Sequence, residues 1–386
     1  MGAGALRLPP YATLLCGICV GYNQLKAHEA YGFMQIEKCV VIPVELSLRR
    51  PVQMSGYPEI GSVTAVFVRI ETRPGKIAWG CAVAHPELTG ESPADVLATC
   101  QECAKLVPDL HPTNIEYSLA ALAPYVNDSP CAACAFDMVF HDLLGLAADM
   151  PVHRLLGGYR DRIQTSVTIP IASVKESVEM ASRHADRGFR MLKIKGGLDA
   201  DQDVQRVRAI QRVLPDVVLR LDADGCYDVQ SALNVARALE EKLEMMEQPT
   251  PPGDKGALKQ VTKLSPIPIL ADQSVTGPES ALSLASERIV DGLSVKVATS
   301  GGLRRASQVD AIARAAQIAT MVGCVIEPAL LIAAGLYFAL SSPNVRYVDL
   351  DGHLDLIDDP TVPGFKLEEG WLIASDVPGL GCTVEL

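Results

Sequence analysis

The sequence has no long hydrophobic run, because none of its apolar stretches reaches the roughly 18 residues that a membrane-spanning helix requires. Basic residues are also scarce, with 34 Lys and Arg against 46 Asp and Glu and a formal net charge of -12. An acidic chain of this kind is a poor partner for nucleic acid or for an anionic membrane surface. We therefore expect neither of them as a partner.

The cysteines do not suit a closed disulfide framework, because their number, 11, is odd. Two of the pairs with CxxC spacing lie in helix-like, Ala-rich segments without the Gly and Pro turns of a zinc ribbon. Small core residues are therefore the preferred interpretation, and a zinc site is the alternative. Free thiols fit a reducing, cytoplasmic setting. The CxxC pairs are Cys16 with Cys19, Cys100 with Cys103, and Cys131 with Cys134.

The first 33 residues differ from the pattern that follows them. Residues 11–22 are mildly apolar and resemble a poor signal peptide, with Arg7 as the only basic residue before them and no clean cleavage site after them. Met34 opens a convincing strand, so a mis-called start is the preferred explanation. An ordered extra element is the third interpretation.

The next part of the chain predicts a small α+β domain over residues 34–162. Residues 35–48 and 62–72 are rich in Val and Ile and predict strands, and the Pro- and Gly-containing stretch 51–61 between them predicts a loop. Helical patterns follow at about 92–107, 113–125 and 130–147. The Pro- and Gly-rich tail, 363–386, is expected to return to this capping domain.

From about residue 163 to residue 362, short β-branched runs alternate with helical stretches. Eight strands that are each followed by a helix predict an α/β fold of the (β/α)8 type, a modified TIM-like barrel. The intervals between successive polar residues at the strand ends are about one barrel unit long. The predicted strands are 166–171, 191–195, 219–224, 245–248, 267–272, 292–297, 323–327 and 346–351.

Carboxylates end three consecutive predicted strands of the barrel, at Asp222, Glu247 and Asp272. Barrel active sites lie at this carboxyl-terminal mouth, and neighbouring strands bring these side chains into one sector. Three carboxylates together repel one another unless a cation lies between them, and all-oxygen ligation suits Mg²⁺. The alternative for each carboxylate alone is a cap on the following helix.

Two lysines, Lys195 and Lys296, end the second and sixth predicted strands, which lie on opposite walls of an eight-stranded barrel. Two bases on either side of one carbon suit a 1,1-proton transfer with inversion. A metal that binds the substrate carboxylate would stabilise the resulting ene-diolate. The nearby ammonium of Lys193, together with the metal, is expected to lower the pKa of Lys195.

The last predicted strand carries Asp349 and Asp351, whose side chains share one face because strand side chains alternate. This strand lies across the barrel from the fourth strand. Two free carboxylates there would receive a substrate cation such as an α-ammonium. The alternative is a simple turn with a helix cap.

As a set, these motifs resemble those of the enolase superfamily, in its muconate-lactonizing branch and most closely the dipeptide epimerases. The similarity covers about residue 34 to the end and rests on Lys-Ile-Lys, LDAD, EQP, ILADQS, SVKVATSGG and GCVIEP, with VDLDG and PELTGES pointing to the epimerase subgroup.

This resemblance implies roles for the residues that match the motifs. It implies that the paired acid/base lysines are assisted by Lys193, and that the VDLDG carboxylates hold the ammonium of a dipeptide. It also implies that Asp222, Glu247 and Asp272 ligate Mg²⁺. Thr168 is expected to line the pocket, with Tyr57 in a mobile lid over residues 51–61.

Members that act on Ala-Glu tend to carry an Arg in that lid. Here Arg50 and Arg69 only bracket it, so we expect a hydrophobic or cationic second residue instead of Glu. Two positions depart from the family pattern, because Asp224 stands where Asn is common and Gln273 where Glu is common.

Other functions share the same frame of lysines and carboxylates. An N-acylamino acid racemase or an o-succinylbenzoate synthase-like enzyme is the first alternative, and a lactonising cycloisomerase is a weaker one. The Asp pair of the last strand favours a dipeptide, because a substrate without an ammonium does not need it. A binding protein without catalytic activity is disfavoured because both lysines and all three carboxylates are present. The oligomeric state, including a homo-oligomer, stays open.

Overall fold

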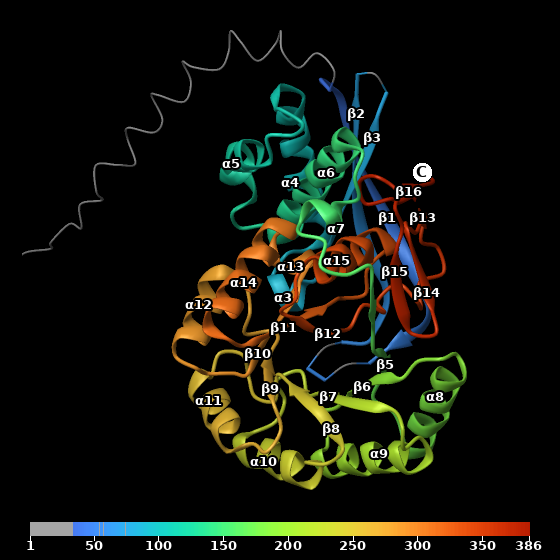
Figure 1. The fold of residues 1–386 in the computed structure, drawn as a ribbon, viewed down its shortest axis with the longest axis vertical. Coiled ribbons are helices and arrows are strands. Elements are labelled where there is room, and N and C mark those ends of the chain that lie inside the picture. The colour runs from blue at the N-terminus through green and yellow to red at the C-terminus, as the bar shows by residue number, and fades with distance from the viewer. Residues whose placement is uncertain (1–33, 54, 57, 74) are drawn as a thin grey trace, which may run out of the picture.

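The structure, a computed structural model, describes residues 34–386 except residues 54, 57 and 74. The expectations for residues 1–33 and for Tyr57 therefore lie outside the described residues. Figure 1 shows two regions, with β1 to β3 and α4 to α6 at one end and an arc of helices from α8 to α12 around parallel strands at the other.

The first region is an antiparallel sheet covered by helices. In the described residues the sheet has the order β1-β2-β3. The first two strands match the prediction, but β3 was not predicted, because its sequence IAWGCAV is continuously apolar and lacks the alternation of a half-exposed strand. The strands are β1 (Ile36–Val52), β2 (Ile60–Thr72) and β3 (Ile77–Val83). The helices are α3 (Pro86–Thr89), α4 (Pro93–Leu106), η1 (Val107–Asp109), α5 (Ile115–Val126), α6 (Pro130–Ala148) and α7 (Val152–Leu155).

Helix α6 is the core of this region and packs against β3. Gly80 of β3 permits the close approach, since a Cβ atom there would lie 1.9 Å from the carbonyl oxygen of Ala135. By length and composition α6 is the one helix of the described residues that could cross a membrane, but 72% of its apolar window is buried inside the protein. The sequence analysis did not count this helix as a long apolar stretch, because Asp137, His141 and Asp142 interrupt it.

The cysteines of two CxxC pairs lie inside this region. Cys100 and Cys103 of α4 and Cys131 and Cys134 of α6 are all fully buried, in agreement with their interpretation as core residues. Burial raises the pKa of the Cys103 thiol to about 12, so this thiol stays protonated at neutral pH. The pair Cys16 and Cys19 lies outside the described residues.

The second region confirms the α/β barrel-type fold. In the described residues, parallel strands run in the order β12-β11-β10-β9-β8-β7-β6-β5. The seventh strand begins and ends four residues earlier than predicted, at Ala319 and Gly323. The strands are β5 (Val167–Ile169), β6 (Met191–Lys195), β7 (Val218–Asp222), β8 (Leu243–Glu247), β9 (Ile269–Ala271), β10 (Gly292–Lys296), β11 (Ala319–Gly323) and β12 (Val345–Val348). The helices are α8 (Val174–Asp186), α9 (Ala200–Val213), α10 (Val229–Ala238), α11 (Lys255–Leu264), α12 (Pro278–Ser286), α13 (Val297–Ser300), α14 (Leu303–Ala316) and α15 (Ala329–Ser341).

The two edge strands of this sheet, β5 and β12, are joined by individual hydrogen bonds. The Ser166 N–H donates to the carbonyl oxygen of Val348 at 3.1 Å, and the Leu350 N–H donates to Thr165 Oγ1 at 2.8 Å. These bonds fix the segment after β12 beside the segment that enters β5. Residues 349–351 therefore lie at the mouth of the barrel, next to the first strand.

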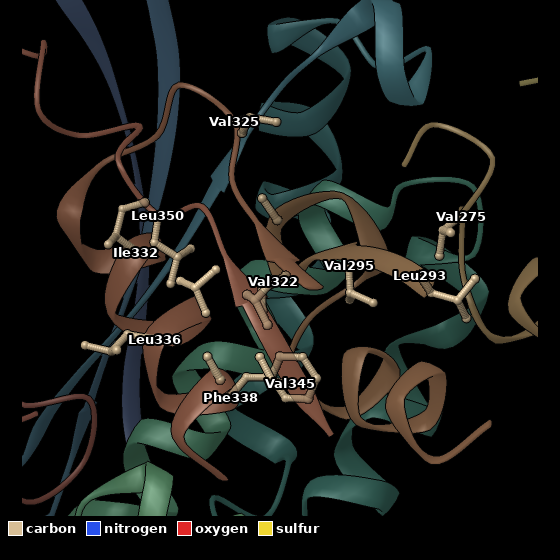
Figure 2. Packing of buried hydrophobic residues seen from close by; sticks show 14 of the residues in the cluster. Val275, Leu293, Val295, Val322, Val325, Ile332, Leu336, Phe338, Val345 and Leu350 are labelled. Atoms are coloured by element: carbon tan, nitrogen blue, oxygen red, sulfur yellow. The ribbon is translucent and has the colours of Figure 1, made fainter. Parts of the chain in front are cut away.

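Helix α15 has no polar face because it contacts the barrel strands on one side and α7, β3 and β4 on the other. Figure 2 shows Ile332 and Leu336 of this helix beside Leu350. Gly335 permits this packing, because a Cβ atom there would lie 2.9 Å from Leu350 Cδ2. With Leu350 anchored beneath α15, Asp349 and Asp351 on either side of it are directed away from that helix.

The tail forms two small sheets and touches both regions. Strands β14 (Phe365–Glu368) and β15 (Trp371–Ala374) pair with β4 (Arg162–Gln164), and β13 (Thr361–Val362) pairs with β16 (Thr383–Val384). Asp142 of α6 accepts hydrogen bonds from the N–H groups of Leu380 and Trp79. The tail is thereby attached to α6 and β3, while the division of the chain into domains stays a prediction.

Asp137 of α6 joins the two regions by capping a helix of the other region. Its carboxylate accepts the N–H groups of Leu303 at 2.6 Å and Arg304 at 3.3 Å, which begin α14, and it contacts His141 at 3.3 Å. Gly302 at the N-cap has a φ of +101° and no side chain to cap the helix. Asp137 therefore caps α14 in place of an N-cap side chain.

We expect Asp137→Ala to lower the free energy of unfolding by about 2–3 kcal/mol, because one buried and one partly buried N–H group lose their acceptor. Urea unfolding followed by circular dichroism measures this change. The matched control is Asp128→Ala, which removes an exposed carboxylate from the same region and should change stability by less than about 0.5 kcal/mol. Equal stability of the two variants would contradict the capping role.

Candidate functional site

The predicted site residues lie together at the carboxyl ends of the barrel strands. Lys195, Asp222 and Glu247 stand in register on β6, β7 and β8, and Asp272 follows β9 directly. The neighbouring loops and strands contribute the other predicted residues. These are Lys193 in β6, Thr168 in β5, Lys296 at the end of β10, and Asp349 and Asp351 after β12.

A cavity of about 160 Å³ opens at this mouth. Its floor is formed by charged residues from the barrel, and its rim includes apolar side chains from β1 and β2. Glu247 is fully buried and does not reach the lining. The charged floor includes Lys193, Lys195, Asp222, Asp224, Asp272, Lys296, Asp349 and Asp351, and the apolar rim includes Leu48, Val52, Ile60 and Leu354.

Lys195 is held between two carboxylates. Its Nζ lies 2.8 Å from Asp222 Oδ2 and 2.8 Å from Asp224 Oδ1. Burial alone would lower the pKa of Lys195, but these two carboxylates outweigh it and raise the pKa, with Lys193 opposing them. The carboxylate that raises this pKa most, Asp222, is also a predicted Mg²⁺ ligand, so the expectation that Lys193 and a bound metal together lower the pKa of Lys195 stays a prediction.

Lys193 connects the last strand to the acidic sector. Its ammonium contacts Asp349 and lies 3.2 Å from Asp222 Oδ2 and 3.5 Å from Glu247 Oε2. Asp349 also accepts a hydrogen bond of 2.7 Å from the Ser166 hydroxyl. The expectation that Asp349 is a free carboxylate is therefore wrong, since the closure of the barrel places it against Lys193.

Lys296 lies on the other side of the mouth and contacts Asp272. Three strands, β7, β8 and β9, separate β10 from β6 in the sheet. The two lysines therefore reach the cavity from different walls, with the three carboxylate-bearing strands between them. Nearby His85 is buried, which lowers its pKa to about 4 and keeps it neutral at physiological pH.

The acidic residues form a buried, oxygen-rich sector. Burial raises the pKa of Glu247 to about 8, and the carboxylates of Asp222 and Asp272 raise it as well, while Lys193 opposes them. Asp224 Oδ2 is buried and lacks a hydrogen-bond partner among the described residues. A cation would offset the repulsion among the buried carboxylates and would give the Asp224 oxygen a partner. The donor set therefore fits a hard divalent ion such as Mg²⁺.

Each of the three predicted ligands is, however, close to a lysine ammonium. Within the described part of the chain, no three His, Cys, Asp or Glu side chains are grouped as the ligands of a metal ion. Asp222 faces Lys195, Glu247 faces Lys193 and Asp272 faces Lys296. That Asp222, Glu247 and Asp272 hold one ion together therefore stays a prediction.

Asp351 is the more accessible carboxylate of its pair. It lines the cavity and accepts the Thr168 N–H at 2.6 Å, and the Cys324 thiol lies 3.7 Å away. Burial, with the nearby charge of Asp349, raises the pKa of Asp351 to about 6. Thr168 also lines the cavity, as expected, through its place in β5.

The two departures from the family pattern contact each other. Gln273 Nε2 donates to Asp224 Oδ1 at 3.2 Å, and the same Asp224 oxygen lies beside Lys195. The amide of Gln273 therefore supports the carboxylate that pairs with Lys195. The two departures form one local unit.

The sequence reading missed Arg220, which lies inside the barrel. It is fully buried in β7, a strand body that was expected to be apolar, and donates to the Val348 carbonyl at 2.8 Å and to Glu244 at 2.7 Å. Because Val348 precedes Asp349, Arg220 supports the backbone of the last strand. A charged residue in the middle of an apolar strand was the available signal.

Comparison with known protein families gives matches over most of the chain. Residues 36–157 match the model of the mandelate racemase / muconate lactonizing enzyme N-terminal domain, and residues 176–385 match that of the enolase C-terminal domain-like family. These matches agree with the resemblance seen in the motifs.

Similar proteins are named epimerases. The chain is 34% identical to an L-Lys-D/L-Arg epimerase of Methylococcus capsulatus over 90% of this chain and 99% of the relative. It is 32% identical to a hydrophobic dipeptide epimerase of Enterococcus faecalis over 83% of this chain and 92% of the relative. A crystal structure of a dipeptide epimerase from Enterococcus faecalis with Mg and L-Leu-L-Tyr matches with a TM-score of 0.88 and 30% identity, covering 91% of this chain and 100% of the other. The prediction of an isomerase of this superfamily is thereby confirmed.

Proposed function

Because this chain belongs to the mandelate racemase and muconate lactonizing enzyme family of the enolase superfamily, we propose that it epimerises dipeptides at the α-carbon of their C-terminal residue. The observation that carries the proposal is the placement of two lysines, Lys195 and Lys296, on different walls of one cavity. An α-carbon between them could lose a proton to one and gain a proton from the other on the opposite face.

We propose that Asp222, Glu247 and Asp272 hold Mg²⁺. When bound there, the ion would supply positive charge that stabilises the negative charge developing on the substrate carboxylate. The dipeptide epimerase of Enterococcus faecalis was crystallised with Mg and a dipeptide, which supports this assignment. Lys193 lines the same cavity, so its ammonium can bind the same substrate carboxylate.

The base must be a neutral lysine and the acid an ammonium. Inversion in one direction uses Lys195 as the base and Lys296 as the acid, and the reverse direction exchanges the roles. Asp222 and Asp224 accept hydrogen bonds from Lys195, and Asp272 accepts one from Lys296. These carboxylates orient the two amines when they are protonated, and the buried position of Lys195 and the largely covered position of Lys296 limit the access of water.

Asp351 favours a dipeptide over an N-acylated amino acid as the substrate. Its carboxylate lines the cavity opposite the acidic sector, at a place where it can accept a hydrogen bond from an α-ammonium. An N-acylamino acid lacks that cation, and binding it would leave a buried carboxylate without a counter-charge. The racemase alternative is disfavoured for this reason.

We expect dipeptides with a hydrophobic or cationic second residue to be better substrates than Ala-Glu. Apolar side chains of β1 and β2 line the rim, and the exposed residues Glu87, Asp355 and Arg187 also line the cavity. A panel of dipeptides incubated with enzyme and MgCl₂ in heavy water, read by mass spectrometry, measures deuterium uptake at the α-carbon. Fastest uptake by Ala-Glu would contradict the expected specificity, and uptake by none of the dipeptides would contradict the proposed function.

A further inference from the structure

Gln248 follows Glu247 and has an unusual backbone conformation. Its φ is +33°, in the left-handed region that favours glycine, and the residue is fully buried. A non-glycine residue there costs about 1–3 kcal/mol and persists only where its surroundings hold it. The side chain therefore provides something that glycine could not.

The side chain of Gln248 connects the loops after β8 and β9. Its Oε1 accepts the N–H groups of Asp272 at 2.9 Å and Ser274 at 3.2 Å. Its Nε2 donates to the Thr250 carbonyl at 2.8 Å and to Ser274 Oγ at 3.0 Å. Both groups of the amide are fully used, and one of the four bonds holds the backbone of Asp272 itself.

The backbone of Gln248 adds the loop after β7. The Gly225 N–H donates to the Gln248 carbonyl at 2.7 Å, and the Gln248 N–H donates to the Leu270 carbonyl at 2.8 Å. Gly225 follows the segment that carries Asp222 and Asp224. One residue therefore contacts the carboxyl ends of all three strands whose carboxylates form the acidic sector.

We propose that Gln248 is a positioning residue that fixes the spacing of Asp222, Glu247 and Asp272 and thereby sets the affinity of the site for a divalent cation. The inference rests on the proposed function, because it assumes that these three carboxylates are the ligands. An amide is suited to this place because it accepts from two N–H groups and donates to two oxygens without adding a charge. A carboxylate in place of this amide would repel the buried carboxylates of Asp222, Asp224, Glu247 and Asp272.

The test is a titration of metal-free protein with MnCl₂ by isothermal calorimetry, at a temperature where every variant is folded. Gln248→Met keeps the length of the side chain but loses its four hydrogen bonds. We expect its Kd for Mn²⁺ to rise at least about 10-fold, the size of effect seen when groups that orient metal ligands are removed. The matched control is Gln230→Met, which changes an exposed residue of α10 that bonds Asn234, and its Kd should stay within about 2-fold of the wild type.

A merely structural role would lower the melting temperature of Gln248→Met and leave its Kd unchanged, which would overturn the inference. If Gln248→Met does not fold, Ser274→Ala decides, because it removes one partner of the amide and should raise the Kd about 2- to 3-fold. An unchanged Kd in Ser274→Ala would then overturn the inference. A wild-type protein that binds no Mn²⁺ would overturn the proposed metal site as well, whereas equal binding by wild type and Gln248→Met would overturn the role of Gln248 alone.

Discussion

Lys195→Ala and Lys296→Ala are each expected to lower the rate of dipeptide epimerisation by roughly 10²- to 10⁴-fold, the usual contribution of a positioned acid or base. The physical reason is that inversion requires a proton to leave one face of the α-carbon and another to arrive on the opposite face. Each variant keeps only one of the two amines. Neither remaining lysine can reach both faces, because β6 and β10 are separated by three strands.

The decisive measurement compares, for each variant, the rate of net inversion with the rate of α-proton exchange without inversion. Each reaction starts from one of the two epimers in heavy water with MgCl₂. Net inversion should be lost in both variants, whereas exchange of the α-proton without inversion should persist for one epimer only. The epimer that still exchanges should differ between Lys195→Ala and Lys296→Ala. Lys242→Ala, which removes an exposed lysine before β8, should behave like the wild type. Full epimerase activity in either catalytic variant would contradict the two-base assignment.

The barrel strands could be predicted because their sequence pattern is local. Short β-branched runs with a polar residue at the end placed Lys195, Asp222 and Glu247 correctly, and the register of β6, β7 and β8 aligns them in the structure. The seventh strand was displaced because ATMVG and GCVIE are both apolar runs that end at a plausible boundary. Glu327 therefore lies beyond the end of β11, where burial raises its pKa to about 8.

The pairing of the site residues with one another was not predictable from such patterns. The contact of Lys193 with Asp349 depends on how β5 and β12 are joined, and it brings together residues 156 positions apart in the sequence. The role of Gln248 depends on a positive φ, which leaves no trace in residue periodicity. The role of Arg220 depends on a bond across the barrel, of which the sequence shows only a charge within an apolar strand. Sequence spacing therefore placed the charges at one mouth but could not say which charges neutralise each other.

These pairings give the two carboxylates of the last strand different expected roles. Asp349 is 2% exposed and contacts Lys193 and Ser166, so its negative charge is paired with the Lys193 ammonium. Asp351 faces the cavity and accepts a backbone N–H from Thr168, a bond that an Asn side chain could also accept. Asp351→Asn therefore removes the charge while keeping the shape and the local hydrogen bond.

We expect Asp351→Asn to lower kcat/KM for a good dipeptide substrate by roughly 10- to 150-fold, since a hydrogen bond to a charged group contributes about 1.5–3 kcal/mol. Most of the change should appear in KM, because the substrate ammonium is bound equally in the ground state and the transition state. The N-acetylated form of the same dipeptide has no ammonium, so its slow turnover should change little. Asp358→Asn, which alters an exposed carboxylate outside the cavity, is the matched control.

The ratio of kcat/KM for the free dipeptide to kcat/KM for the acetylated dipeptide separates loss of ammonium recognition from structural damage to the site. Damage to the site would lower turnover of the free and the acetylated dipeptide together, whereas loss of an ammonium receptor lowers only the first. If Asp351→Asn reduced both substrates equally, Asp351 would act through the fold of the last strand. If the wild type preferred the acetylated form, the cavity would not recognise a free ammonium. An N-acylated amino acid derivative would then be the better assignment of the substrate.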